Sequence, residues 1–258
     1  MPNNSPKLIQ SVQRAIDILN CFNNTKPELN INEISAHTKL NVNTARGLIN
    51  TLVANGLLMY DSDTAIYRLG NFFLTKAGIL QAQIRSYILM CKHLVNDLAE
   101  KYHLTASLQI VNQDEIVTLY CAYPVSTSYY ITLSEYTPLP IYATSSGKLL
   151  LAHTLLPERP EIINELKFHS YTPYTINTKE QLLDQLEQVT LQGYSLELEE
   201  FNMDVGSIAV PVFNYNQELV ATVSCTFFAK SLPDIKCDLV KELMTIGEEI
   251  ARNIGTNH

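Results

Sequence analysis

Residues 41–70 read NVNTARGLINTLVANGLLMYDSDTAIYRLG, and this stretch carries the clearest structural pattern in the chain. From an N-cap at Asn41, apolar residues recur at i, i+3, i+4, i+7 and i+8, which predicts an amphipathic helix ending at Asn55-Gly56. The apolar runs on either side of residues 61–65 predict a β-hairpin with a polar tip. The apolar stripe of the helix consists of Ala45, Leu48, Ile49, Leu52 and Val53.

Two shorter helices are predicted upstream of this stretch. Apolar spacing predicts the first over residues 11–22 with Ser11 as its cap, and Asn30 with Glu33 resembles a capping box that opens the second. Helix, helix, turn, helix and hairpin within about 60 residues is the order of a winged helix-turn-helix, whose third helix can enter a major groove. The pattern alone leaves open a small helical domain used for protein contacts.

The polar face of the third helix favours DNA over a protein partner. Asn43, Thr44 and Arg46 fall outside the apolar stripe, near the start of the helix, and these side chains suit base edges and phosphates. Gly47 costs about 1 kcal/mol within a helix relative to alanine, but it would let the helix lie close to a sugar-phosphate backbone. The predicted DNA-binding residues are Asn43, Thr44, Arg46, Gly47, Asn50 and Arg68.

The charge of the chain is unevenly distributed. The 258 residues carry a net charge of −8, yet residues 1–70 hold six basic and five acidic groups, a net of +1, which leaves −9 for the remainder. An acidic C-terminal part would stay away from phosphates while a nearly neutral N-terminal part approaches them. The expected partner is therefore double-stranded operator DNA, bound by the N-terminal part alone.

Composition excludes several other classes of protein. No apolar run approaches the roughly 18 residues needed to span a bilayer, and residues 1–7 lack the layout of a secretory signal, so we expect a cytoplasmic protein without membrane contact. The five cysteines are scattered and never form a Cys-x-x-Cys pair, and the histidines show no metal-ligand spacing. We therefore expect reduced thiols, no metal and no cofactor.

The rest of the chain predicts a linker and a second domain. Residues 71–102 contain no proline and one glycine, Gly78, and predict a long helix, broken at most near that glycine. The mixture of short β-rich runs and helical patterns beyond residue 102 predicts an α+β domain with a mainly antiparallel sheet. The expected strands are 105–111, 115–123, 129–133, 206–213 and 219–228, and the expected helices 146–153, 157–166, 178–192 and 234–254. The predicted domains are 1–70, 71–102 and 103–258.

Four strings of the chain belong together: SVQRAIDIL at 11–19, NTAR with GLL at 43–46 and 56–58, PIYATSSGK at 140–148, and GSIAVPVF at 206–213. In this order they resemble the IclR family of bacterial transcriptional regulators, and the resemblance covers about residues 9–255. It implies a winged helix-turn-helix, a linker helix, a GAF-like effector-binding domain, and homodimers or dimers of dimers. Ser207, Ser145 and Gly47 depart from the residues usual in the family, which leaves the effector and the operator open.

The expected effector is a small organic acid whose carboxylate lies near the start of the helix at Ser145 and Ser146, because a helix N-terminus favours an anion. An ionised Glu197 would repel that anion unless it met a hydroxyl or amine, which favours a hydroxy or keto acid over a dicarboxylate. The alternative is that Ser145 only caps the helix and Ser224 only satisfies a backbone carbonyl. The resemblance implies a pocket of Leu139, Ser145, Ser146, Gly147, Glu197, Ser207, Ser224 and Thr226.

Parts of the sequence are compatible with two other functions. Ser145-x-x-Lys148 matches one motif of penicillin-recognising enzymes, but the companion motifs are absent, so we expect an exposed lysine on a serine-capped helix and no enzyme. Glu199 and Glu200 are adjacent and would point apart in a strand, which is unlike a glycosidase pair. A ligand-sensing or protein-interaction module without DNA binding is the second rival, and the N-terminal 70 residues argue against it.

Overall fold

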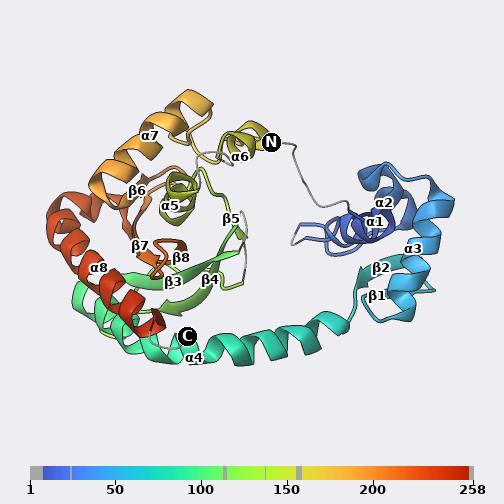
Figure 1. Ribbon diagram of the computed structural model, residues 1–258, viewed down its shortest axis with the longest axis horizontal. Helices are drawn as coiled ribbons and strands as arrows, with labels where there is room; N and C mark the ends of the chain where they lie inside the picture. The colour runs from blue at the N-terminus through green and yellow to red at the C-terminus, as the bar shows by residue number, and fades with distance from the viewer. Residues whose placement is uncertain (1–7, 24, 113–114, 137, 155–158, 256–258) are drawn as a thin grey trace. The chain divides into compact units, whose positions relative to one another are not determined.

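The computed structural model describes residues 8–23, 25–112, 115–136, 138–154 and 159–255 (Figure 1). The chain divides into two compact units, residues 1–84 and 85–258, with the boundary inside the long helix α4 (Phe72–Tyr102). This helix is continuous through Gly78. No helix among the described residues combines the length and the apolar character that a membrane span needs.

The first unit has the predicted order of elements. α1 (Gln10–Leu19), α2 (Ile31–Thr38) and α3 (Val42–Ala54) precede an antiparallel hairpin of β1 (Leu58–Asp61) and β2 (Ile66–Leu69). The winged helix-turn-helix prediction is confirmed in this arrangement.

Most of the predicted local signals in the first unit are also confirmed. The Asn30 side chain accepts from Glu33 N while the Glu33 side chain accepts from Asn30 N, the reciprocal pair of a capping box. The Asn41 side chain accepts from Thr44 N and caps α3. The prediction for the first helix is wrong at both ends, because its N-cap is Ile9, which offers no side-chain acceptor, and the helix ends at Leu19.

The apolar stripe of α3 supplies the core of the first unit. Ala45, Ile49 and Leu52 are buried against residues of α1, α2 and the hairpin. Burial of large apolar side chains is the main stabilising contribution in a unit of this size, at about 1.5 to 3 kcal/mol for each. The other buried members of this core are Ile18, Phe22, Leu29, Ile34 and Leu58.

The second unit is built on one six-stranded antiparallel sheet with the strand order β5-β4-β3-β8-β7-β6. The predicted α+β class with an antiparallel sheet is confirmed. The strands are β3 (Thr105–Asn112), β4 (Glu115–Ala122), β5 (Pro138–Leu139), β6 (Ser195–Leu198), β7 (Val205–Phe213) and β8 (Leu219–Phe228). The helices are α5 (Ser145–His153), α6 (Arg159–Glu165), α7 (Lys179–Gln192) and α8 (Leu232–Gly255), with a 3-10 turn, η1 (Ala229–Ser231), before the last.

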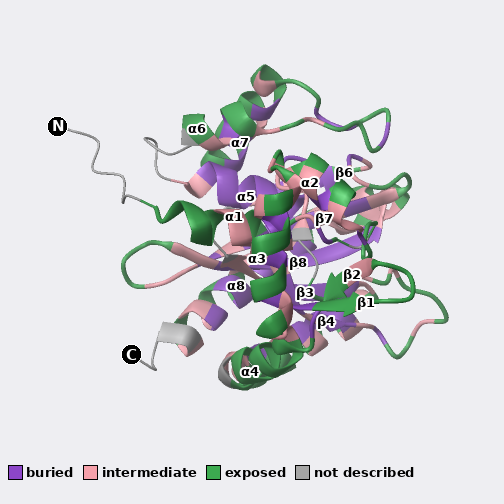
Figure 2. Cartoon of the chain, turned by 90° about the vertical axis from the view of Figure 1, so that its right-hand side faces the viewer, coloured by how far each residue is buried: buried purple, intermediate pink, exposed green. Residues whose placement is uncertain are grey.

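The two faces of this sheet differ in chemistry. Because successive side chains of a strand point to opposite faces, Val223, Cys225 and Phe227 of β8 enter an apolar core formed with α8 and the end of α4 (Figure 1). Ser224 and Thr226 point to the other face, where α5 packs against β7 and β8. Figure 2 shows β7 and β8 largely buried. One face of the sheet therefore stabilises the unit, and the other carries buried polar groups.

The sequence-based predictions were wrong for four elements of the second unit. Residues 129–133 form no strand, although their composition favours one. Side chains hold this segment instead of a strand ladder: Thr105 Oγ1 donates to Ile131 O at 2.6 Å and Tyr123 Oη donates to Leu133 O at 3.2 Å. The short strands β5 and β6 were not predicted, and α8 begins at Leu232 rather than 234. Of the predicted helix 157–166, residues 157 and 158 lie outside the described part of the chain.

Candidate functional site

The exposed face of α3 presents the residues predicted to contact DNA. Asn43, Arg46, Gly47 and Asn50 are exposed and Thr44 is half-buried, and the surface of α3 is largely exposed in Figure 2. A Cβ at Gly47 would meet no atom within 4 Å, so packing inside the unit does not explain this glycine. The face is polar, and its single cation is Arg46.

Arg68, on the hairpin strand β2, is held by acidic neighbours. Its Nε donates to Glu28 Oε1 at 2.8 Å, and its Nη1 lies 3.9 Å from Asp61 Oδ2. The hydrogen bond and charge of Glu28 raise the pKa of Arg68. A phosphate would have to compete with these two carboxylates for the guanidinium group.

A small cavity of about 100 Å³ lies between the sheet and the start of α5 and contains seven of the eight predicted effector residues. Below we call it the sensor cavity. The seven are Leu139, Ser145, Ser146, Glu197, Ser207, Ser224 and Thr226, and the residues that sequence reasoning missed are Gln109, Ile131, Thr132, Leu133, Thr144, Phe201, Asn202 and Val205. Residues 131–133 were missed because they were assigned to a strand.

Strand register explains why these residues meet. Glu197 of β6 lies opposite Ser207 of β7, and Ser207 lies opposite Thr226 of β8. Ser224 lies opposite Ser107 of β3 in the neighbouring row. Residues far apart in sequence thus form two polar rows on the face that α5 covers.

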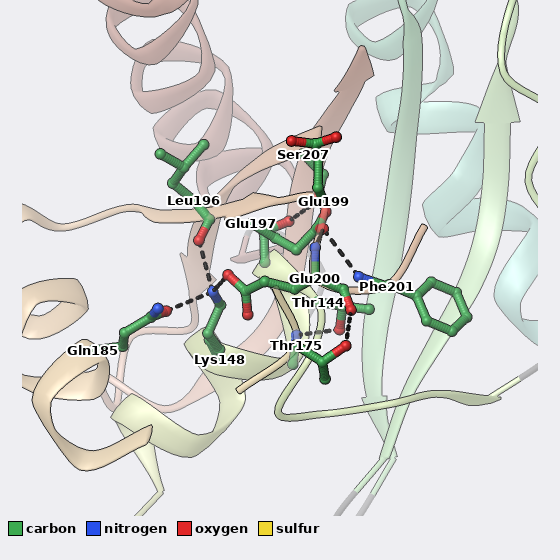
Figure 3. Close-up of polar contacts among 12 residues, drawn as sticks. Thr144, Lys148, Thr175, Gln185, Leu196, Glu197, Glu199, Glu200, Phe201 and Ser207 are labelled. Atoms are coloured by element: carbon green, nitrogen blue, oxygen red, sulfur yellow. Dashed lines mark hydrogen bonds and ion pairs between the residues drawn. The ribbon is translucent and has the colours of Figure 1, made fainter. Parts of the chain in front are cut away.

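A chain of hydrogen bonds connects α5 with β6 across the sensor cavity. Ser145 Oγ and Ser207 Oγ are 2.7 Å apart, and Ser207 Oγ donates to Glu197 Oε2 at 3.1 Å. Glu197 Oε1 accepts from the backbone N–H groups of Glu200 at 2.7 Å and Phe201 at 3.2 Å. Figure 3 shows the contacts of Glu197 with these groups.

Glu197 is a buried acid with an unusual pKa. Only 4% of the residue is exposed, and this burial raises its pKa to about 7, against the opposing effect of the Phe201 and Glu200 N–H groups. The nearby Glu200 carboxyl raises it further. The carboxyl therefore gains or loses a proton near neutral pH, and the repulsion expected between an ionised Glu197 and an anion depends on pH.

Ser224 belongs to a second buried network on the same face. Gln109 Nε2 donates to Ser107 Oγ at 2.8 Å and to Ser224 Oγ at 2.9 Å, while Thr222 Oγ1 donates to Gln109 Oε1 at 3.0 Å. The alternative in which Ser224 only satisfies a backbone carbonyl is wrong, because its partners are side chains. Ser145 is not the helix cap either, since the Thr144 side chain accepts from Gly147 N.

Gly147 supports the cavity without lining it. A Cβ at this position would lie 2.3 Å from Ile141 Cα and 2.4 Å from Ile141 O. Only glycine permits this approach of α5 to the preceding backbone. The structure therefore gives Gly147 a packing role at the N-terminus of α5.

Lys148, expected to be exposed, is completely buried. Its Nζ donates to Glu200 Oε1 at 2.7 Å, Gln185 Oε1 at 2.7 Å and Leu196 O at 2.8 Å (Figure 3). Burial lowers the pKa of Lys148 and raises that of Glu200. The pH range in which both groups are charged is therefore narrower than for an exposed pair. Glu199 and Glu200 follow β6 and lie outside any strand, so the argument that they point apart in a strand does not apply.

Two larger cavities of the second unit have a different chemistry. One of about 660 Å³ lies between α8 and the end of β7, and one of about 420 Å³ is lined by aromatic residues and shares Ile131 and Thr226 with the sensor cavity. The sensor cavity is the smallest of the three, but buried hydroxyls, an amide and a carboxyl converge in it. Among the described residues no cluster of His, Cys, Asp and Glu could hold a metal ion, and all five cysteines are free thiols.

The chain matches two family models. The model described as "Bacterial transcriptional regulator IclR C-terminal" matches residues 83–254, and the "IclR helix-turn-helix domain" matches residues 11–62. The HTH-type transcriptional regulator XynR of Escherichia coli (strain K12) is 28% identical over 250 residues, which cover 96% of this chain and 98% of that protein.

Solved structures share the fold. An IclR family transcriptional regulator from Brucella abortus superimposes with a TM-score of 0.83 at 22% identity, covering 98% of this chain and 95% of the other. An IclR homolog from Microbacterium hydrocarbonoxydans, complexed with 4-hydroxybenzoate, gives a TM-score of 0.67 at 20% identity, covering 94% of this chain and 99% of the other.

Proposed function

The chain belongs to the IclR family of bacterial transcriptional regulators, and we propose that its effector is a small hydroxy or keto acid bound in the sensor cavity. It is a DNA-binding regulator with an N-terminal helix-turn-helix and a C-terminal effector-binding domain. The convergence of Ser145, Ser207 and Glu197 at the start of α5 supports the choice of effector.

The cavity offers complementary groups to such an acid. The first N–H groups of a helix have no partner within it and carry a partial positive charge, so the start of α5 attracts a carboxylate. Ser224 and Thr226 add hydroxyls for a second polar group of the ligand. 4-Hydroxybenzoate, which is bound to the Microbacterium homolog, is an acid with a hydroxyl at its far end.

Thermal-shift screening of hydroxy and keto acids tests this proposal. We expect an acid to stabilise the full chain, and we expect Ser145→Leu and Ser207→Leu to abolish the shift because leucine fills the cavity. The neutral amides of the same acids are the control for the charge. Equal stabilisation of the native protein and both variants would show that the ligand binds elsewhere. Binding of the amides alone would show that the effector is not an anion.

For the DNA-binding unit, we propose that Asn43, Thr44, Arg46, Gly47 and Asn50 face the operator from α3, with Arg68 on the hairpin near its backbone. We expect Arg46→Ala to lose roughly 1 to 3 kcal/mol of binding if the contact is to a base, or to reduce the salt dependence if it is to a phosphate. Gel shifts with the protein's own upstream region measure both effects. Lys241→Ala, which removes an exposed cation from α8, is the matched control.

An Arg46→Ala variant with native affinity and native salt slope would contradict this orientation of α3. No binding of the native protein to its upstream region would instead favour a ligand-sensing module that does not bind DNA. The two outcomes are distinguishable because the native protein binds its upstream region in the first and does not bind it in the second.

The assembly and the place of action are also part of the proposal. One short helix on a nearly neutral unit supplies few contacts, so we propose a homodimer or a dimer of dimers that reads two half-sites, about one helical turn apart or a multiple of it. Light scattering at micromolar concentration tests this. We propose residues 1–70, 71–102 and 103–258 as DNA-binding domain, linker helix and effector-binding domain of a cytoplasmic protein that is not an enzyme.

A further inference from the structure

Three side chains in the sensor cavity form a relay whose direction depends on one proton. Ser145, Ser207 and Glu197 are linked by hydrogen bonds in series, and Ser145 is the member of the series at the N-terminus of α5. We propose that Ser145 donates a hydrogen bond to a ligand carboxylate only when Glu197 is protonated, so that binding of an organic acid takes up one proton from solvent. This inference deepens the proposed function and rests on it.

The geometry fixes where the proton sits. Glu197 Oε1 already accepts two backbone N–H bonds, from Glu200 and Phe201, so a proton there would displace a donor. Glu197 Oε2 has Ser207 as its hydrogen-bonded neighbour. A protonated Glu197 therefore carries its hydrogen on Oε2 and directs it to Ser207 Oγ.

The ionised carboxylate orients the relay away from the ligand. Glu197 Oε2 can then only accept, so Ser207 uses its single hydrogen to donate to it. At a separation of 2.7 Å, the two serine oxygens need a hydrogen between them, and only Ser145 can still supply it. The Ser145 hydroxyl then offers the cavity nothing but lone pairs, which repel a carboxylate.

Protonation reverses the direction of every bond in the relay. Glu197 Oε2 donates to Ser207, Ser207 donates to Ser145, and the hydrogen of Ser145 is free to point into the cavity. A carboxylate ligand accepts that hydrogen beside the N-terminus of α5. The negative charge of Glu197 is also absent in this state, so the ligand enters a neutral site.

The electrostatic surroundings of Glu197 place the pKa of its carboxyl near physiological pH. Burial raises the pKa of Glu197 to about 7, and repulsion from Glu200 contributes to the rise, while the two N–H groups and Ser207 lower it. The charged groups that face Glu197 are Glu200, from the turn after β6, and Lys148, from α5, and these two form an ion pair with each other. β7 contributes only the neutral Ser207 to this contact.

Calorimetric titration of the full chain with lactate, 2-oxobutyrate and 4-hydroxybenzoate, in two buffers of different ionisation enthalpy, counts the protons taken up. We expect close to one proton per ligand at about pH 8.5 and almost none at about pH 5.5. Because the ligands are ionised throughout, affinity should fall roughly tenfold per pH unit above about pH 7 and stay constant below it.

Two variants separate the relay from simple repulsion. Glu197→Gln offers a permanent amide donor to Ser207 and should bind the acids with a flat pH profile and no proton uptake. Ser207→Ala keeps the Glu197 carboxyl but disconnects it from Ser145, and it should lose most of the pH dependence. Glu187→Gln, which removes an exposed carboxylate from α7, is the matched control and should titrate like the native protein.

The possible outcomes distinguish a failure of the relay from a failure of the proposed function. If Ser207→Ala keeps the native pH dependence while Glu197→Gln loses it, direct repulsion accounts for the effect and the relay is wrong. Binding that is lost in Ser145→Leu but takes up no proton at any pH also overturns the relay and leaves the proposed effector site intact. If none of the three acids binds at any pH, the proposed function fails together with the relay.

Discussion

Each unit of the molecule contains an ion pair of almost the same length, and the two pairs lie in opposite environments. Arg68 Nε and Glu28 Oε1 are 2.8 Å apart in the first unit, where the side chains are 47% and 50% exposed. Lys148 Nζ and Glu200 Oε1 are 2.7 Å apart in the second unit, where the side chains are 0% and 7% exposed. Equal distances do not give equal energies, because water screens the first pair and is excluded from the second.

The contrast extends to the whole of each unit. Every described residue that is both buried and polar or charged lies between Thr105 and Thr226, in the second unit. The core of the first unit is apolar, and its polar side chains lie on the surface. A unit that meets a large external partner keeps its polar groups outside, whereas a unit that encloses a small ligand buries them and must satisfy them there.

Removing the buried cation should have the largest effect. We expect Lys148→Met to destabilise the second unit by about 3 to 5 kcal/mol, because Glu200 is left buried without its counter-charge. Chemical denaturation followed by circular dichroism measures the change. The double variant Lys148→Met with Glu200→Leu removes both charges and should recover most of the lost stability. Equal destabilisation of the single and the double variant would show that the unpaired charge of Glu200 is not the cause.

Glu197→Gln should have a smaller effect that depends on pH. The pKa of Glu197 is raised from 4.5 to about 7 in the folded state, so its contribution is fully present below about pH 4.5 and is lost as pH rises through 7. The glutamine variant does not titrate, and its stability relative to the native protein should rise by about 2 to 4 kcal/mol across this interval and then level off. Parallel stability curves of the two proteins from pH 4 to pH 8 would refute this.

Removing the exposed cation of the first unit should have the smallest effect on stability. We expect Arg68→Ala to change the stability of the first unit only slightly, and the change should shrink further in high salt because the pair is exposed. The midpoint of denaturation at low and high salt is the measurement. A loss as large as that of Lys148→Met would contradict the contrast between the two units.

The same contrast explains what could be predicted from the sequence. The first unit follows from local rules: the stripe of α3, the capping box at Asn30 and the cap at Asn41 each depend on residues a few positions apart. The burial of Lys148 does not, because its partner Glu200 is 52 residues away and only the folded sheet brings them together.

The candidate site was predicted in part for a similar reason. Family resemblance placed seven pocket residues, but periodicity had no means of identifying Gln109, whose partners Ser224 and Thr222 lie on another strand. Residues 129–133 were misread because β-branched and aromatic composition favours a strand, while their hydrogen bonds go to the side chains of Thr105 and Tyr123.

The alternation of side chains along β7 and β8 has a consequence for how such a regulator evolves. Ser207, Ser224 and Thr226 point toward the sensor cavity, whereas Ile208, Val223 and Cys225 on the other face hold the sheet against α4 and α8. If the proposed effector site is right, substitutions at the first set should change which acid binds while the packing on the other face stays intact. The alternation of side chains along one sheet thus places the residues open to functional change and the residues that stabilise the fold on opposite faces.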